Sequence, residues 1–434
     1  MAYPKTPGFS ELASRLALYS QLQHEYGAKN ISPILKRAER DLQSALAELK
    51  RLPIDERMAD REPNDLASIK KLRPKGPRRL WEGMDKKQFQ DKCEGALLGR
   101  MAGCTLGAPV EGWPIHRMKN LAKENGDAFP PKDYWSYVYY PKALRYGVSP
   151  VEAYTRDKIK GVPVDDDVVY TLLGLLIAED FGSDFTTEEV GQAWLKYLPY
   201  AATAEAVALA NLKKGVSAKK AAVKDNPFCE WIGADIRSDP WGYMAPGWPE
   251  KAAEMAYQDA FISHRRQGIY GEMYFSAVIA AAFTVSDPME ALEIGLSEIP
   301  KDSAMAKAVR WALKTAPQIR NYQMARDAVD RRFDGMSPVH TLNNACLTIW
   351  GLTIGGTDLT KAIGETVAMG LDNDCTAATV GSILGAVVGK EGIPEHWYRN
   401  FDNTVHSYLI GKKRFSISGL AKRFARQAIR VHGQ

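Results

Sequence analysis

Two acidic segments, each directly ahead of a helix-like stretch, are the parts of this chain best suited to chemistry. In residues 370–381, Asp372 and Asp374 lie two positions apart, ahead of small and aliphatic residues. In residues 164–168, three aspartates follow one another. Aspartate is favoured at helix N-termini, so an N-cap explains either segment taken alone. Three adjacent like charges, however, repel one another unless water or a cation lies between them. We therefore predict that the two segments converge in space on a metal site, whose oxygen ligands favour Mg²⁺ or Mn²⁺ over zinc.

The composition is that of an ordinary globular protein. The 434 residues are 45% hydrophobic and 25% charged, with a net charge of +5. The five cysteines form no CxxC pair, which argues against a zinc ribbon or a disulfide framework and favours a reducing compartment. The N-terminus has no apolar region typical of a signal peptide, and runs such as 275–285 are too short to span a membrane. We expect a cytoplasmic protein with no membrane partner.

A basic run occupies residues 70–79, which contain six lysines and arginines and no acid. Such a patch can bind nucleic acid. It lacks interleaved aromatic residues, however, and its prolines and glycine are typical of an exposed linker. We therefore expect a linker here and no nucleic-acid partner.

Helix signals dominate the rest of the chain, and strand signals are nearly absent. Residues 1–84 are predicted to form a helical hairpin, from two apolar stripes within 10–26 and 32–51, followed by the basic linker. The hairpin cannot bury much surface alone, so it is expected to pack on the main domain or on another subunit of a homo-oligomer. Residues 85–434 are predicted to form one all-α domain. Its helices are expected at 89–101, 168–180, 189–198, 203–213, 250–263, 273–285, 303–315, 342–352 and 359–369.

Glycines recur every four residues in two of these segments, at 95, 99, 103 and 107 and again at 381, 385 and 389. A glycine inside a helix costs about 1 kcal/mol relative to alanine. Spacing of four places each set on one helix face, which permits close backbone contact. We predict a tightly packed helix pair that brings the segment after Gly107 near the helix of Asp372.

These segments resemble the signatures of a known family, the ADP-ribosylglycohydrolases, which includes the bacterial dinitrogenase-reductase-activating glycohydrolase. Residues 95–111, which end in Ala-Pro-Val-Glu, resemble its N-terminal signature. Residues 165–167 resemble the second signature, normally Thr-Asp-Asp-Thr, and residues 370–375 resemble the third, normally Gly-Gly-Asp-Thr-Asp-Thr. The three occur in the family's order and span about 89–389.

The resemblance implies a compact all-α fold with two Mg²⁺ or Mn²⁺ ions in a central cleft. Glu111, at the end of the first signature, is implied as a catalytic residue together with Asp166. The implied metal ligands are Asp165, Asp166, Asp167, Asp372, Asp374 and Cys375. Asp165 and Cys375 stand where the family has threonine, and Cys104 stands where it has aspartate. A thiol is a poor ligand for a hard cation, so these departures leave the metal at each position open.

The resemblance also implies substrate-binding residues, namely Gly233, Arg237, His264, Tyr270 and Gly271. Arg237 ends a segment that aligns with a substrate loop and could pair with a phosphate. Tyr270 and Gly271 lie in a glycine-containing stretch, where the tyrosine could stack on a base. The alternatives are a structural, hydrogen-bonded His264 and packing roles for Arg237 and Tyr270.

We therefore predict a metal-dependent glycohydrolase that cleaves the glycosidic bond of an ADP-ribosylated protein or of a small ribosyl substrate. One alternative is a hydrolase of a nucleoside-like or other N-glycoside, which the altered signatures allow. Another is a catalytically silent relative that binds ADP-ribose.

Overall fold

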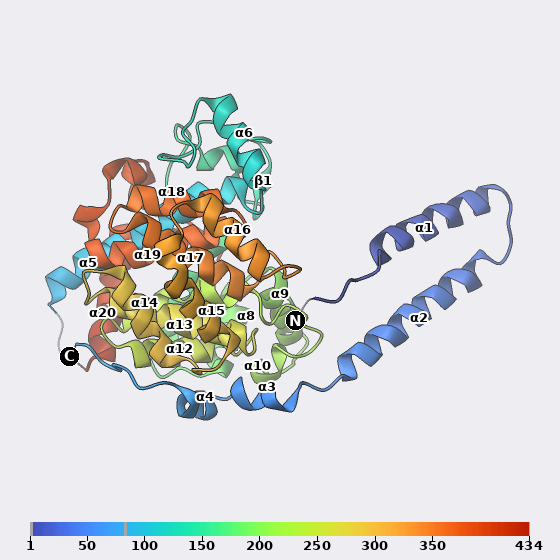
Figure 1. Cartoon of the computed structure of the whole chain (residues 1–434), viewed down its shortest axis with the longest axis horizontal. Helices are drawn as coiled ribbons and strands as arrows, with labels where there is room; N and C mark the ends of the chain where they lie inside the picture. The colour runs from blue at the N-terminus through green and yellow to red at the C-terminus, as the bar shows by residue number, and fades with distance from the viewer. Residues whose placement is uncertain (1–2, 82–84, 434) are drawn as a thin grey trace. The chain divides into compact units, whose positions relative to one another are not determined.

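The protein is almost entirely helical, as predicted. The computed structural model describes residues 3–81 and 85–433 (Figure 1). Within these residues, extended structure is confined to two antiparallel ribbons. The first pairs β1 (Leu144–Arg145) with β2 (Ser149–Pro150), and the second pairs β3 (Thr404–His406) with β4 (Arg414–Ser416). None of the described helices combines the length and the apolar character that crossing a bilayer requires.

The chain divides into two units, residues 1–60 and 61–434. The first contains α1 (Phe9–Glu25) and α2 (Ile31–Arg51), and α3 (Glu56–Arg61) ends at the boundary. The described residues of α1 and α2 include no buried side chain, and Leu12 and Leu49 are among their exposed apolar residues. Two helices therefore form where the sequence predicts the hairpin, and they carry apolar side chains on their own surface.

The larger unit is a helical domain with one hydrophobic core. In chain order its α-helices are α4 (Leu66–Leu72), α5 (Lys86–Gly107), α6 (Ile115–Asn125), α7 (Asp166–Phe181), α8 (Thr187–Tyr197), α9 (Thr203–Lys213), α10 (Ala218–Ala221), α11 (Asp239–Met244), α12 (Pro249–Ala260), α13 (Gln267–Ala282), α14 (Pro288–Gly295), α15 (Ala304–Thr315), α16 (Tyr322–Arg332), α17 (Thr341–Gly355), α18 (Leu359–Met369), α19 (Asn373–Val388) and α20 (Ile417–Val431). Short 3-10 helices connect them at η1 (Ala108–Val110), η2 (Val151–Tyr154), η3 (Ile232–Arg237), η4 (Leu296–Glu298), η5 (Ala316–Gln318), η6 (Lys390–Gly392), η7 (Glu395–Trp397) and η8 (Arg399–Phe401).

Two predictions about this domain need correction. The basic run is no exposed linker, because Arg73 and Arg78 both form ion pairs with the fully buried Glu298, and Ile69 of α4 is buried. Residues 61–80 thus belong to the larger unit, since their cations find acidic partners there. The helix predicted at 273–285 begins earlier, at Gln267, because the glycines of this stretch serve helix packing rather than a turn.

The glycine-spaced helices α5 and α19 pack against each other in backbone contact, as the four-residue spacing predicts. A Cβ atom added at Gly99 would lie 2.1 Å from the carbonyl oxygen of Gly381, and one at Gly103 would lie 2.1 Å from that of Ala377. At the end of the pair, a Cβ on Gly107 would meet the Cα of Asp374 at 2.5 Å. The predicted approach of the first and third acidic signatures is thereby confirmed.

Replacing Gly103 by alanine is expected to destabilise the domain by about 1–3 kcal/mol, because the added methyl group forces the two backbones apart. Chemical denaturation monitored by circular dichroism measures the change. Gly8→Ala is the control, since a Cβ there meets nothing nearer than 3.9 Å. Equal stability of the two variants would show that the close contact carries no energetic weight.

Candidate metal centre

Two helix N-termini present the acidic residues. Asp165 is the N-cap of α7, where its side chain accepts a hydrogen bond from the backbone N–H of Asp167 at 3.2 Å. Asp372 is the N-cap position of α19 and follows a left-handed turn at Gly370 and Leu371, with φ of 73° and 61°. Glycine adopts this conformation freely, whereas leucine is held in it by the surrounding structure. The turn directs the chain so that both Asp372 and Asp374 face the cleft described below.

The two acidic segments lie close together, as the sequence predicts, since Asp165 and Asp374 contact the same nitrogen of Arg145. Ligand atoms lying within 4.8 Å of one another form two groups among the described residues: Cys104, Asp165 and Asp167, and Glu111, Asp372 and Asp374. Glu111 follows η1, and the next residue donates its backbone N–H to the carbonyl oxygen of Leu371 at 3.0 Å. The first and third signatures are thus joined directly, while Asp166 and Cys375 belong to neither group.

Arg145 lies among these carboxylates, although no sequence pattern predicts it as part of the site. Its Nη2 donates to Asp165 Oδ2 at 2.9 Å, to Glu111 Oε2 at 3.0 Å and to Asp374 Oδ2 at 3.2 Å. The neighbouring Tyr146 donates its hydroxyl to Asp166 Oδ1 at 2.5 Å. Both residues come from the β1–β2 hairpin, whose sequence has no motif that predicts a place in the site.

Several acidic residues of the site have raised pKa values, because they are buried close together with few cations nearby. Burial raises the pKa of Asp166 and Asp374 well above the usual range, and repulsion from neighbouring carboxylates raises both further. Burial and the nearby Glu111 raise the pKa of Asp372 to about 7. Arg100 holds the start of α7, donating to the carbonyl oxygen of Asp167 at 2.6 Å, but its shortest ion pair, also 2.6 Å, is with Asp239.

These residues fit a divalent cation. Asp374 Oδ1 is buried without a hydrogen-bond partner, as expected of an oxygen that ligates an ion. Five aspartates and one glutamate provide the oxygens that Mg²⁺ and Mn²⁺ prefer. The thiols of Cys104 and Cys375 fit less well, because burial raises the pKa of each well above its usual value and keeps it protonated.

A cleft opens beside the acidic cluster. Besides its carboxylates, the cleft has aromatic and small residues in its walls. The lining residues are Glu111, Tyr146, Asp166, Asp167, Tyr170, Ala202, Thr203, Glu205, Trp231, Ile232, Gly233, Ile236, Val339, Asp372 and Asp374. Of the substrate-binding residues that the family resemblance implies, this lining includes Gly233 alone.

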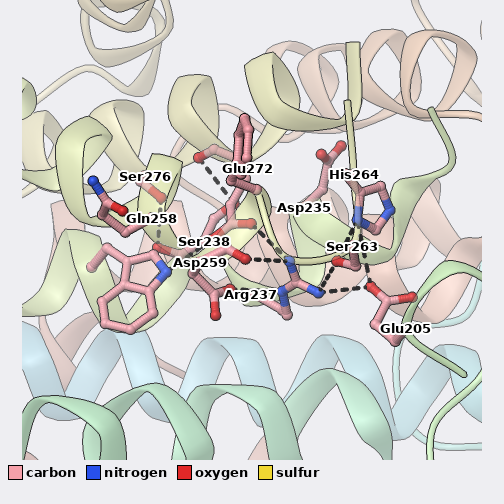
Figure 2. Close-up of polar contacts among 12 residues, drawn as sticks. Glu205, Asp235, Arg237, Ser238, Gln258, Asp259, Ser263, His264, Glu272 and Ser276 are labelled. Atoms are coloured by element: carbon pink, nitrogen blue, oxygen red, sulfur yellow. Dashed lines mark hydrogen bonds and ion pairs between the residues drawn. The ribbon is translucent and has the colours of Figure 1, made fainter. Parts of the chain in front are cut away.

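Arg237 lies in the core instead of the cleft. It is 1% exposed and is surrounded by three carboxylates, as Figure 2 shows. Its Nε pairs with Asp259 at 2.7 Å and its Nη1 with Glu205 at 2.9 Å, while Glu272 completes the set at 3.3 Å from Nη2. A guanidinium so fully paired is not available to a phosphate.

The other three implied substrate residues are buried as well. Nδ1 of His264 forms a hydrogen bond with the hydroxyl of Ser263 (Figure 2). Burial and the nearby Arg237 lower the pKa of His264 well below its usual value, so the ring is neutral. Tyr270 is fully buried and donates its hydroxyl to the carbonyl oxygen of Pro63. Gly271 is helical, where a Cβ would lie 2.1 Å from Asp235 Oδ1. The packing alternatives therefore describe these side chains.

Glu205 also lines the cleft, although the sequence did not predict it as a site residue. It is 2% exposed, and the ion pair with Arg237 orients its carboxylate beside Gly233, whose missing side chain leaves room for it. No local pattern predicts this contact of Glu205, since an acidic residue in the first turn of a helix such as α9 is common. Its partner Arg237 follows it by more than thirty residues.

A family model identifies the family of this chain, and a solved structure shares its fold. A family model described as ADP-ribosylglycohydrolase matches residues 85–431. An uncharacterized protein of Archaeoglobus fulgidus is 24% identical over 323 residues, which cover 71% of this chain and 91% of that protein. A solved structure described as an ADP-ribosylglycohydrolase-related protein complex superposes with a TM-score of 0.53 at 19% identity. That match covers 79% of this chain and 99% of the other.

Proposed function

This chain belongs to the ADP-ribosylglycohydrolase family, and from that premise we propose that it is a metal-dependent hydrolase that cleaves the glycosidic bond of an ADP-ribosylated protein or a related ribosyl substrate. The observation that carries the proposal is the convergence of Glu111 with Asp166, Asp167, Asp372 and Asp374 at one cleft, with Asp165 beside Asp167. Such a concentration of buried carboxylates is costly unless cations neutralise it.

The aspartates would hold the Mg²⁺ or Mn²⁺ ions, Asp165–Asp167 from the start of α7 and Asp372 and Asp374 from the start of α19. When bound, such ions polarise a sugar hydroxyl and lower the pKa of a bound water. Asp166 lines the cleft and has one oxygen held by Tyr146, which fixes the orientation of its carboxylate toward substrate.

Glu111 is the residue placed to handle a proton. It lines the cleft, and its side chain is 40% exposed, so substrate and water reach it. In hydrolysis a water adds to the anomeric carbon as the bond to the aglycone breaks, through an oxocarbenium-like state that nearby carboxylates stabilise. Glu111 accepts the proton that the attacking water loses, and the leaving group departs with the bonding pair.

One observation favours a second candidate, a hydrolase of a neutral N-riboside. The described residues that line the cleft include no lysine or arginine, and Arg237 is occupied by carboxylates. A diphosphate is usually held by such cations or by backbone N–H groups. A nucleoside-like substrate makes no such demand, and Trp231 and Tyr170 offer aromatic surface to its base.

An assay with the purified full chain and Mn²⁺ tests both candidates. The panel contains ADP-ribosyl-arginine, ADP-ribosyl-serine and simple N-ribosides. Release of ADP-ribose from either of the first two supports the proposed function, whereas cleavage of the ribosides alone supports the second candidate. Tight ADP-ribose binding without turnover of any substrate would contradict both and identify a silent relative.

A further inference from the structure

Arg145 contacts the acidic residues through one nitrogen that several carboxylates share, as they would share a bound metal ion, and not through two nitrogens on one carboxylate. A single nitrogen, Nη2, serves the carboxylates of Glu111, Asp165 and Asp374 within 3.2 Å. Nη1 donates instead to the backbone carbonyl of Ala108 at 2.8 Å, and Nε is buried without a partner. Pairs between arginine and a carboxylate are frequently bidentate, with two parallel N–H groups on one carboxylate. Here one corner of the guanidinium is surrounded by oxygens from all three signatures.

Positive charge is scarce around this point. Among the described residues, the ion pairs to the six carboxylates come from Arg145 and Arg100. The contact of Arg100 with Asp167 measures 3.5 Å, longer than its 2.6 Å pair with Asp239. Arg145 is thus the principal positive charge on the cluster, and its removal leaves buried carboxylates unpaired.

The hairpin that carries Arg145 contacts the domain through one side only. Tyr146 faces inward, where its ring lies 5.7 Å from that of Tyr408 and its carbonyl oxygen accepts from the hydroxyl of Tyr200. Leu144 and Val148 are 60% and 47% exposed, so the described residues of the larger unit leave these two side chains largely uncovered. The inward contacts of Tyr146 anchor the hairpin, whereas its outer side chains pack against little.

We propose that Arg145 is a built-in counter-ion that competes with the divalent cation for Asp165 and Asp374, and that it pairs with Glu111 beside them. It neutralises these oxygens in the metal-free protein, and ion binding displaces its guanidinium from them. The physical reason is exclusion: a divalent ion binds oxygens at about 2.0–2.6 Å and repels a guanidinium on the same oxygens. Coupling of this kind is reciprocal, so Arg145 weakens ion binding as much as the ion weakens the Arg145 contacts. The proposal rests on the metal dependence proposed above.

Titration calorimetry of the metal-free full chain with Mn²⁺ tests the competition. Arg145→Ala and Arg145→Gln, which lack the charge, are expected to bind Mn²⁺ at least about tenfold more tightly than the wild type, or to bind one ion more per chain. Arg145→Lys keeps the charge and should resemble the wild type more closely. Lys142→Ala is the matched control, because it removes a cation from the same segment that pairs with Glu152, away from the cluster. It should leave Mn²⁺ binding unchanged.

Thermal unfolding provides a readout that a purely structural arginine would not give. In EDTA, Arg145→Ala should melt several degrees below the wild type, because buried carboxylates have lost their cation. Saturating Mn²⁺ should remove most of that difference. A deficit of the same size with and without Mn²⁺ would overturn the proposal.

The outcomes separate this inference from the proposed function. If the wild type and Arg145→Ala bind Mn²⁺ equally, the competition is refuted and metal dependence stands. If only the charge-free variants bind, Arg145 excludes the ion as inferred, and the wild type is not a metal-dependent hydrolase. If neither binds, both ideas fail.

Discussion

Replacing Glu111 by glutamine is expected to lower turnover by about 10²–10⁴-fold, the usual contribution of a general acid–base group. Glutamine has nearly the same shape but cannot accept the proton of an attacking water. The substrate for this measurement is whichever compound of the panel the wild type cleaves, with Mn²⁺ present. Because Glu111 is partly exposed at the edge of the cleft, the exchange should leave the fold intact.

Two measurements keep this result interpretable. Thermal unfolding should show a melting temperature close to that of the wild type, since no buried partner other than Arg145 loses a contact. Glu290→Gln, which alters an exposed residue of α14, should retain full turnover. Undiminished turnover in Glu111→Gln would remove Glu111 from the mechanism, whatever its place in the cleft.

The second large effect concerns Asp374. In the wild type, Mg²⁺ or Mn²⁺ at one hundred times its dissociation constant should stabilise the protein by about 2.7 kcal/mol through mass action. Asp374→Ala is expected to abolish that stabilisation, because the residue contacts Arg145 and supplies the buried oxygen that has no other partner. Unfolding with EDTA and with each metal measures the difference.

The metal-free Asp374→Ala protein should not be greatly destabilised. Burial and the nearby Glu111 already raise the pKa of this carboxyl well above its usual range, so its charge is unfavourable without an ion. Asp157→Ala, at an exposed site, serves as the control and should keep the full metal response. An equal metal response in Asp374→Ala would show that the ion binds elsewhere.

Local sequence features determined the fold class and the acidic half of the site. Helix signals are set by residues a few positions apart, so α9 and α18 begin and end where predicted. The glycine spacing of α5 and α19 also carried long-range information, because only a second backbone explains four missing side chains on one face. From that pairing the approach of Glu111 to Asp374 followed.

The tertiary structure alone decided which other side chains reach the acidic cluster and which stay in the core. Arg145 lies in a two-stranded ribbon without any motif, and its role arises because the folded chain places it among carboxylates from three distant segments. Arg237 occupies the expected segment, yet its ion pairs with Glu205, Asp259 and Glu272 hold it in the core. A sequence pattern fixes the types and order of residues. The direction of a side chain depends on the charges and packing it meets, and these come from residues far away in the chain.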